Sequence, residues 1–305
     1  MRIAVFPGQG SQTPGFLVPW LALDGSADRL AQYSEWSGVD LLAAGTEWDA
    51  DRIRDTQVAQ PLIVAASLLS WNALPSTDSV DGVAGHSVGE FAAAAAAGIL
   101  TEEDALRLVG IRGRAMAEAA AAEQTGMSAV IGGDQDAVVA RLEELGLTPA
   151  NYNGGGQLVA AGSLNALADL TAAPPAGTRV IALQVAGAFH TAYMAPAVEA
   201  LRAAAATVTA SDPRVTVWSN SDGAAVGSGS AFVDLLVAQV ASPVRWDLSM
   251  ASFANGGVSG IVELSPAGTL TGLAKRALRG VPAVAVKTPD DLEAAAALLS
   301  GATDA

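Results

Sequence analysis

The feature that most constrains this chain is the pentapeptide Gly85-His86-Ser87-Val88-Gly89, which has the Gly-x-Ser-x-Gly pattern of a nucleophile elbow. A short apolar run, Val80 to Ala84, precedes it, and the alanine-rich segment Glu90 to Leu100 follows it. These flanks predict a strand, a tight turn and a helix, which is the context that the motif requires. The pattern therefore predicts an activated Ser87 beside a helix N-terminus. The alternative is a glycine-bounded turn in which the serine only caps the helix.

Composition and charge limit the class of protein. Hydrophobic residues make up 51% of the 305 residues and charged residues 15%, which predicts a globular chain. The net charge of -15 argues against a general nucleic-acid or polyphosphate binder. With no cysteine, disulfides and thiolate chemistry are excluded. The longest apolar helix candidate, Phe91 to Leu100, is too short for a bilayer span, which needs about 20 residues. We expect a soluble, cytoplasmic protein without a secretion signal or membrane partner.

The first part of the chain alternates strand and helix patterns. Ile3 to Phe6 predicts a buried strand that ends at a glycine-rich loop, and Gln60 to Trp71 has the length and apolar face of a helix. Thr101 and Asp104 form a helix N-terminal capping pattern. Alternation of this kind is typical of a parallel sheet, with functional loops at the carboxyl ends of its strands.

From about residue 126 the rhythm changes to the order β-α-β-β-α-β of a ferredoxin-like unit. After His190 the alternation of strands and helices resumes. We therefore predict an α/β fold in which a hydrolase-like parallel-sheet core, residues 1–125 and 188–305, is interrupted by a small ferredoxin-like subdomain, residues 126–187. The predicted elements of the subdomain are the strands Met127 to Ile131, Ala150 to Asn153, Leu158 to Ala161 and Thr178 to Val185, and the helices Asp134 to Leu145 and Ser163 to Leu170.

Few residues of this chain could act as the base that activates Ser87. Histidine is the usual choice because its pKa lies near neutrality, and the chain has only His86 and His190. His86 adjoins the nucleophile, where its side chain points to a different side, so we expect it to support the site. His190 lies at the junction of the two predicted units, where a cleft would form. His190 is therefore the predicted base, and with 31 acidic residues the group that orients its imidazole stays open.

Seven segments together resemble bacterial malonyl-CoA:acyl carrier protein transacylases over nearly the whole chain. The resemblance implies a hydrolase-like core with a ferredoxin-like insertion, in agreement with the alternation of elements. The segments are Phe6 to Gln12, Gly85 to Glu90, Arg107 to Gly113, Asn151 to Gly154, Ala188 to His190, Ser219-Asn220 and Ser242 to Trp246.

The resemblance also implies roles for individual residues. Ser87 and His190 match the nucleophile and base, and the main-chain carbonyl of Gln239 matches the group that orients the imidazole. Arg112 matches the arginine that binds the malonyl carboxylate, for which a guanidinium offers two parallel hydrogen bonds. The remaining matches are the backbone N–H groups of Gln9 and Val88 as oxyanion donors, Asn153 near the acyl pocket, and Phe189 as the ring that excludes an α-methyl branch.

The implied reaction is a ping-pong transfer of malonyl from malonyl-CoA to the pantetheine thiol of holo acyl carrier protein through a malonyl-serine. No permanent cofactor or metal is expected, since phosphopantetheine arrives on the partner, and a monomer is the default. Carrier proteins of this kind are acidic, as is this chain. Docking therefore needs a local basic patch, for which Lys275, Arg276 and Arg279 are the best-clustered candidates. The sequence does not indicate whether this activity would serve fatty-acid, long-chain lipid or polyketide synthesis.

Other functions stay open at this point. Asp222 in Ser221-Asp222-Gly223-Ala224 could serve a patatin-like serine–aspartate hydrolase, and a simple esterase or thioesterase needs only the serine and the histidine. From a different class, the chain could be a silent binding subunit or a dinucleotide binder, but Gly8-Gln9-Gly10 lacks the third glycine of that fingerprint.

Overall fold

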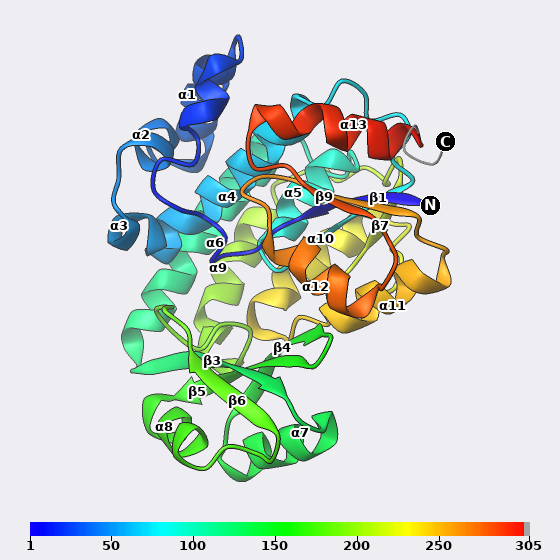
Figure 1. Ribbon diagram of the computed structural model, residues 1–305. Helices are drawn as coiled ribbons and strands as arrows, with labels where there is room; N and C mark the ends of the chain where they lie inside the picture. Colours follow the sequence, from blue (N-terminus) through cyan, green and yellow to red (C-terminus); the bar gives the residue numbers. More distant parts are fainter. Residues whose placement is uncertain (302–305) are drawn as a thin grey trace.

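Among residues 1–301, which the computed structural model describes, five parallel strands form the larger sheet in the order β7-β2-β1-β8-β9 (Figure 1). The first strand of the chain lies at the centre of this sheet, paired with β2 on one side and β8 on the other. The strands are β1 (Arg2–Phe6), β2 (Gly82–Gly85), β7 (Thr216–Trp218), β8 (Gly260–Glu263) and β9 (Ala283–Ala285).

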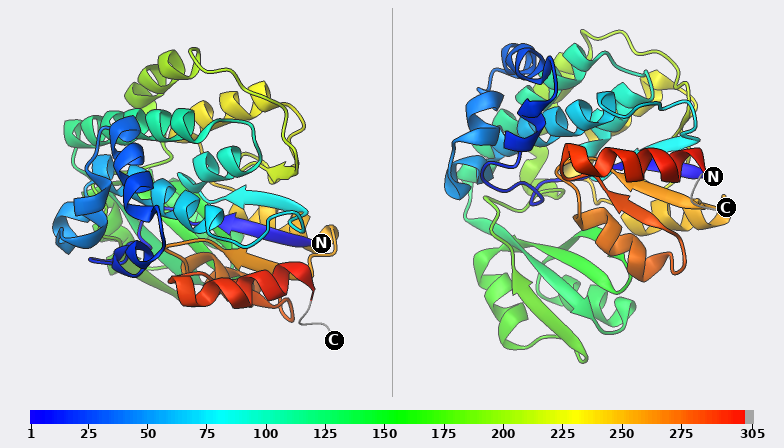
Figure 2. Two further views of the ribbon diagram at one scale, coloured as in Figure 1. Left: turned by 90° about the horizontal axis from the view of Figure 1, so that it is seen from above. Right: turned by 45° about the horizontal axis from the view of Figure 1, so that its top comes forward.

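Helices cover both faces of the large sheet, as the apolar run of β1 predicts. Alternate residues of a strand point to opposite faces, and here both sets are apolar. Figure 2 shows helices on both sides of this sheet. Ala4 and Phe6 pack in the core with α4, α5, α6 and α13, whereas Ile3 and Val5 pack with α11 and α12. These helices are α4 (Thr56–Asn72), α5 (Gly89–Ala96), α6 (Glu102–Ala122), α11 (Trp246–Asn255), α12 (Thr269–Ala277) and α13 (Leu292–Ser300).

A four-stranded antiparallel sheet with two helices lies beside the large sheet, at the bottom of Figure 1. Its strand order β4-β5-β3-β6 places the first and third strands of the unit at the centre, as expected for a ferredoxin-like arrangement. The limits at residues 126 and 187 stay a proposal for the extent of the inserted unit. Its elements are β3 (Thr125–Gly132), α7 (Gln135–Glu144), β4 (Thr148–Gly154), β5 (Gln157–Ser163), α8 (Leu164–Ala172) and β6 (Thr178–Ala182).

Two predicted elements end earlier than expected. The helix after the elbow stops at Ala96, not Leu100, because Gly98 takes a φ of 78° and closes the helix end. The strand predicted to reach Val185 stops at Ala182, since the Val185 N–H turns back to the Leu183 carbonyl at 3.1 Å.

The segment from residue 18 to residue 54 carries short helices that the sequence analysis did not identify. An aspartate side chain caps the start of α2 and of α3: Asp40 accepts the backbone N–H of Ala43, and Asp49 accepts that of Arg52. The elements not yet named are η1 (Val18–Ala22), α1 (Ser26–Ser37), α2 (Leu41–Thr46), α3 (Ala50–Arg54), η2 (Ala192–Met194), α9 (Ala195–Ala205), α10 (Gly229–Ala238), η3 (Gln239–Ala241) and η4 (Pro289–Asp291).

Candidate active site

Ser87 lies in a tight turn between β2 and α5, at the carboxyl edge of the large sheet. Its φ of 53° is a conformation that side-chain-bearing residues seldom adopt. The flanking glycines make the turn possible, because a Cβ at Gly85 would overlap the backbone of Gly89, and one at Gly89 would overlap that of Phe6. The predicted strand, turn and helix are therefore present, with the serine at the top of the turn.

A hydrogen-bonded chain joins Ser87 to His190 and then to a main-chain carbonyl. Ser87 Oγ lies 2.7 Å from His190 Nε2, and His190 Nδ1 lies 2.9 Å from the carbonyl oxygen of Gln239. Since a carbonyl only accepts, Nδ1 carries the proton and Nε2 is free to accept the serine proton. The imidazole is thus held without a carboxylate, in the arrangement that leaves Nε2 basic.

The surroundings keep His190 uncharged. Burial, followed by the positive charge of Arg112, lowers the pKa of His190 to about 3. The residue also has a φ of 60°, a strained backbone that packing must hold in place. At neutral pH the imidazole is therefore unprotonated and able to act as a base.

Arg112 is fully buried on α6, although its neighbours Arg107 and Arg114 on the same helix make partners elsewhere. Its two terminal nitrogens donate to neutral amide oxygens, Gln60 Oε1 at 2.6 Å and Gln239 Oε1 at 3.0 Å. Its Nε has no partner among the described residues, and burial lowers the pKa of Arg112 to about 10. The guanidinium is therefore a buried cation without an ion pair, suited to a small anionic group.

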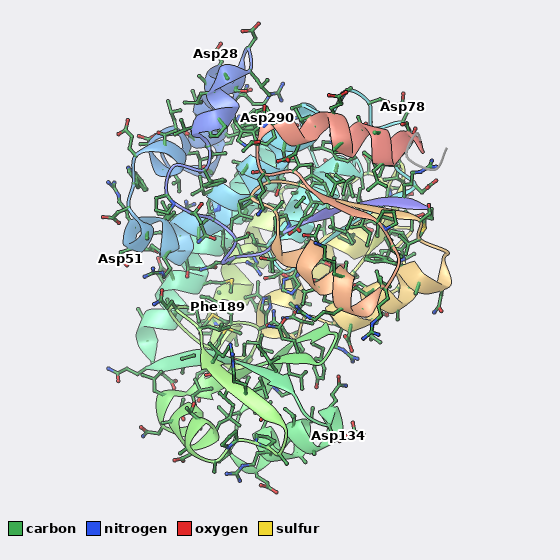
Figure 3. All side chains as sticks on the ribbon, viewed as in Figure 1. Asp28, Asp51, Asp78, Asp134, Phe189 and Asp290 are labelled. Atoms are coloured by element: carbon green, nitrogen blue, oxygen red, sulfur yellow. The ribbon has the colours of Figure 1, made fainter. Side chains whose placement is uncertain are left out.

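A cavity of about 270 Å³ unites these groups. Its walls come from the loop after β1, the elbow, α6, the small sheet and α12, so it lies where the two sheets meet. Figure 3 shows Phe189 at this junction, and its ring is 6% exposed. Residues that line the cavity include Gly8, Gln9, Gln60, His86, Ser87, Val88, Arg112, Asn151, Asn153, Phe189, His190 and Leu273.

The other predicted site residues lie near the serine. Gln9 and Val88 line the cavity in the two turns that flank Ser87, which suits them to donate backbone N–H groups. Asn153 also lines it, and its Oδ1 lies 2.9 Å from His86 Nε2. Burial lowers the pKa of His86, whose ring packs edge-on against Trp246. The structure thus places His86 beside the serine as a support for Asn153.

The predicted basic patch and the rival aspartate both lie on the surface. Lys275, Arg276 and Arg279 are exposed; the first two end α12, whose other turns line the cavity, and Arg279 follows the helix rather than lying on it. Asp222 is exposed and accepts the Ala224 N–H at 3.0 Å. The partner of Ser87 Oγ is His190, so the serine–aspartate arrangement does not match this geometry.

Three polar residues that support the site, Gln60 in the cavity wall and Asn220 and Glu90 behind it, were given no role in the sequence analysis. Gln60 holds Arg112, Asn220 Oδ1 accepts the Ser87 N–H at 2.7 Å, and Glu90 contacts both Asn220 and Gln239. The sequence could have indicated Gln60, because it is the one polar residue in the apolar run from Val58 to Ala66 of α4. A buried polar side chain in such a stretch needs a hydrogen-bond partner, and here the partner is Arg112.

Within residues 1–301, no helix is long and apolar enough to cross a membrane, and no group of three potential metal-binding side chains comes together.

A serine–histidine pair at the carboxyl edge of a parallel α/β sheet, beside a buried arginine, is typical of an enzyme that transfers acyl groups. The family model described as an acyl transferase domain matches residues 4–296. The chain belongs to this acyl transferase family and, within it, to the malonyl CoA-acyl carrier protein transacylases.

The relatives match over nearly their whole length. The malonyl CoA-acyl carrier protein transacylase of Mycobacterium tuberculosis is 54% identical over 291 residues, which cover 94% of this chain and 96% of that protein. The crystal structure of MCAT from the same organism superposes with a TM-score of 0.93 at 53% identity, covering 97% and 100% of the two chains. A malonyl-transacylase solved with a type II PKS acyl-carrier protein has a TM-score of 0.89 at 30% identity, covering 98% and 99%.

Proposed function

We propose that this chain transfers a malonyl group from malonyl-CoA to the pantetheine thiol of an acyl carrier protein in two steps. The observation that carries the proposal is the meeting of the Ser87–His190 pair and the unpaired Arg112 cation in one small cavity. The pair supplies a nucleophile for a thioester, and the cation selects an acyl group with a distal carboxylate. The names of the relatives support the same substrates.

In the first step, His190 Nε2 takes the proton of Ser87 as Oγ attacks the malonyl thioester carbonyl. The tetrahedral oxyanion accepts hydrogen bonds from the N–H groups of Gln9 and Val88, each of which contributes about 10²–10³ in rate. When the C–S bond breaks, His190 returns the proton to the CoA thiolate. The second step reverses these events with the carrier thiol as the attacking group, and leaves Ser87 free.

A transfer assay tests the proposal. Holo acyl carrier protein, malonyl-CoA and enzyme are mixed, and the carrier is followed by intact-protein mass spectrometry. We expect malonyl-carrier to accumulate far faster than malonyl-CoA is hydrolysed in the absence of carrier. Hydrolysis at the same rate with and without carrier would support a thioesterase instead. We propose that the enzyme acts in the cytoplasm as a monomer, with no permanent cofactor.

We propose that the carrier protein docks on the basic patch formed by Lys275, Arg276 and Arg279. The aspartates labelled in Figure 3 are spread around the outline of the molecule, so an acidic partner needs a local exception to the net charge of -15. The patch lies at the end of the helix that lines the cavity with Leu270 and Leu273.

Charge reversal at Lys275 and Arg279 together is expected to lower kcat/KM for the carrier by about tenfold at low salt, with a smaller loss at high salt. The control is Arg179→Glu, a charge reversal at one exposed position on the edge strand β6, which matches the charge change of either single reversal, Lys275→Glu or Arg279→Glu. Carrier kinetics that stay unchanged, or that change equally in the control, would place the docking surface elsewhere.

Phe189→Ser is expected to admit an α-methyl branch into the cavity. The ring lines the cavity, and a pocket that gains room for one methyl group changes discrimination by about 10–200-fold. We therefore expect the ratio of kcat/KM for malonyl-CoA to that for methylmalonyl-CoA to fall by at least about tenfold. Leu183→Ser, at another position in the cavity wall, is the control. An unchanged ratio in Phe189→Ser would show that the ring does not set this selectivity.

A further inference from the structure

Glu90 is a buried carboxyl group with no part in the proton transfers described above. It is 1% exposed and lies in the first turn of α5, three residues beyond the nucleophile. Its Oε1 accepts the backbone N–H of Asn220 at 2.6 Å, and its Oε2 accepts from the side-chain amide of Gln239. A buried carboxylate is costly unless it is fully hydrogen-bonded, so this position is unusual for a residue that only fills space.

The first contact leads to the nucleophile. Asn220, held through its main chain by Glu90, accepts the Ser87 N–H at Oδ1 (2.7 Å) and donates from Nδ2 to the Gly85 carbonyl (2.7 Å). One amide therefore spans the turn from the end of β2 to the serine itself. Movement of Asn220 would move the strained Ser87 backbone away from His190.

The second contact leads to the arginine. The Gln239 side chain accepts from Arg112 at Oε1, so its Nε2 must face Glu90. The orientation of this amide is thus determined at both ends, by a donor on one side and an acceptor on the other. The main-chain carbonyl of the same residue accepts from His190.

We infer that Glu90 is a positioning residue whose carboxylate fixes the Ser87 turn through Asn220 and the Arg112 guanidinium through Gln239. Because neutral amides separate Glu90 from Arg112, the carboxylate orients the cation without pairing with it. The cation stays available to a substrate carboxylate. The Arg112 branch of this inference rests on the proposed function, whereas the Ser87 branch does not.

Opposing effects act on the pKa of Glu90. Burial raises the pKa of Glu90 to about 8, against the hydrogen bond from the Asn220 backbone and the positive charge of Arg112, which both lower it. Arg112 on α6 is the charged group that faces it. The residue after β7, Ser219, and Gln239 of η3 present neutral side chains, and neutral His190 lies beyond Gln239. Glutamine at position 90 imitates the protonated carboxyl, with a donor facing the Gln239 donor.

The test is the variant Glu90→Gln, studied with two reagents. Malonyl-CoA needs Arg112 in addition to Ser87 and its base His190, whereas phenylmethylsulfonyl fluoride, a neutral reagent, needs Ser87 and His190 but not Arg112. Mispaired buried polar groups cost about 1–3 kcal/mol, or about 5–150-fold. At pH 9.5, where wild-type Glu90 is ionised, we expect sulfonylation of Ser87 in Glu90→Gln to slow by about tenfold and malonylation by about 100-fold with a raised KM, at unchanged folded fraction. The unequal losses distinguish positioning from simple destabilisation.

The pH dependence gives a second readout. As pH falls through about 8, wild-type Glu90 becomes protonated and comes to resemble the variant. The wild-type to variant ratio of sulfonylation rates should therefore shrink from pH 9.5 to pH 6. The control is Glu102→Gln, which removes a carboxylate that accepts from three side chains, Arg29, Tyr33 and Asn72, away from the cavity, and should leave the sulfonylation rate unchanged.

Equal losses with both reagents, or a ratio that is constant with pH, would overturn the inference. If Glu90→Gln does not fold, the wild-type sulfonylation rate must itself fall between pH 9.5 and pH 6, and a flat profile contradicts the inference. If wild type reacts with the sulfonyl reagent in this Glu90-dependent way but is not malonylated, the proposed function fails and the Ser87 branch stands.

Discussion

His190→Ala should lower the rate of Ser87 malonylation by on the order of 10⁴-fold or more, because no other side chain within residues 1–301 is hydrogen-bonded to Ser87 Oγ to take its proton. Ser87 Oγ contacts His190 Nε2 at 2.7 Å, and the second histidine, His86, is bound to Asn153. The measurement is the rate of appearance of malonyl-enzyme in rapid-quench mass spectrometry. The stabilising N–H groups of the turn remain, so slow residual acylation is expected.

Asp222→Asn is the matched control for His190→Ala. Asp222 is the nucleophile partner in a patatin-like mechanism, but here it is exposed and accepts only a local backbone N–H. We expect the control to malonylate at the wild-type rate. The reverse pattern, with activity lost in Asp222→Asn and spared in His190→Ala, would replace the serine–histidine mechanism with a serine–aspartate one.

Arg112→Ala should lower kcat/KM for malonyl-CoA by about 10²–10⁴-fold, as expected for the loss of two hydrogen bonds to a charged group at about 1.5–3 kcal/mol each. Most of the loss should appear in KM. The Arg112 cation also lowers the pKa of His190, so its removal makes the imidazole more basic. Sulfonylation of Ser87 by a neutral reagent should therefore be retained or accelerated in this variant.

The control for Arg112→Ala is Arg107→Ala on the same helix, where the side chain binds Asp104 and Thr207 at the surface. It should leave malonyl-CoA kinetics within about twofold, as is usual for surface positions. If Arg112→Ala kept the wild-type KM, or lost sulfonylation as severely as malonylation, the arginine would serve the fold or the base rather than the substrate carboxylate.

The same electrostatics suggest how a dicarboxylic acyl group assists its own transfer. Arg112 makes an imidazolium at His190 unfavourable while the cavity is empty. Under the proposed function, a malonyl carboxylate paired with Arg112 would neutralise that charge and so raise the basicity of His190. A neutral acyl group would leave the pKa of His190 low, so the proposed selectivity would extend from binding to the proton transfer.

The fold could be predicted where local patterns decide it. The strand, elbow and helix around Ser87, the Thr101 cap and the β-α-β-β-α-β order all follow from local residue types, and the structure confirms them. The short helices of residues 26–54 were missed because helices such as α3, with five residues, carry too few apolar positions to show a period. The end of α5 depended on the backbone conformation of Gly98, which the apolar pattern does not contain.

The site was predictable in its reactive residues and unpredictable in their supports. Glycines mark the turn of Ser87, and a chain with two histidines leaves little choice of base. The roles of Asn220 and Glu90 depend on contacts between residues 130 positions apart in the sequence, which no local pattern contains. In the sequence, only the family resemblance distinguishes Arg112 from the other arginines of its helix. In the structure, burial distinguishes it.

The most direct measurement is intact-protein mass spectrometry of the enzyme mixed with malonyl-CoA, followed by addition of holo acyl carrier protein, with Ser87→Ala as the control. The account predicts one malonyl adduct on wild type, none on the control, and rapid loss of the adduct with matching gain on the carrier. No adduct on wild type, or an adduct lost to water at the same rate with and without carrier, would contradict transfer through Ser87.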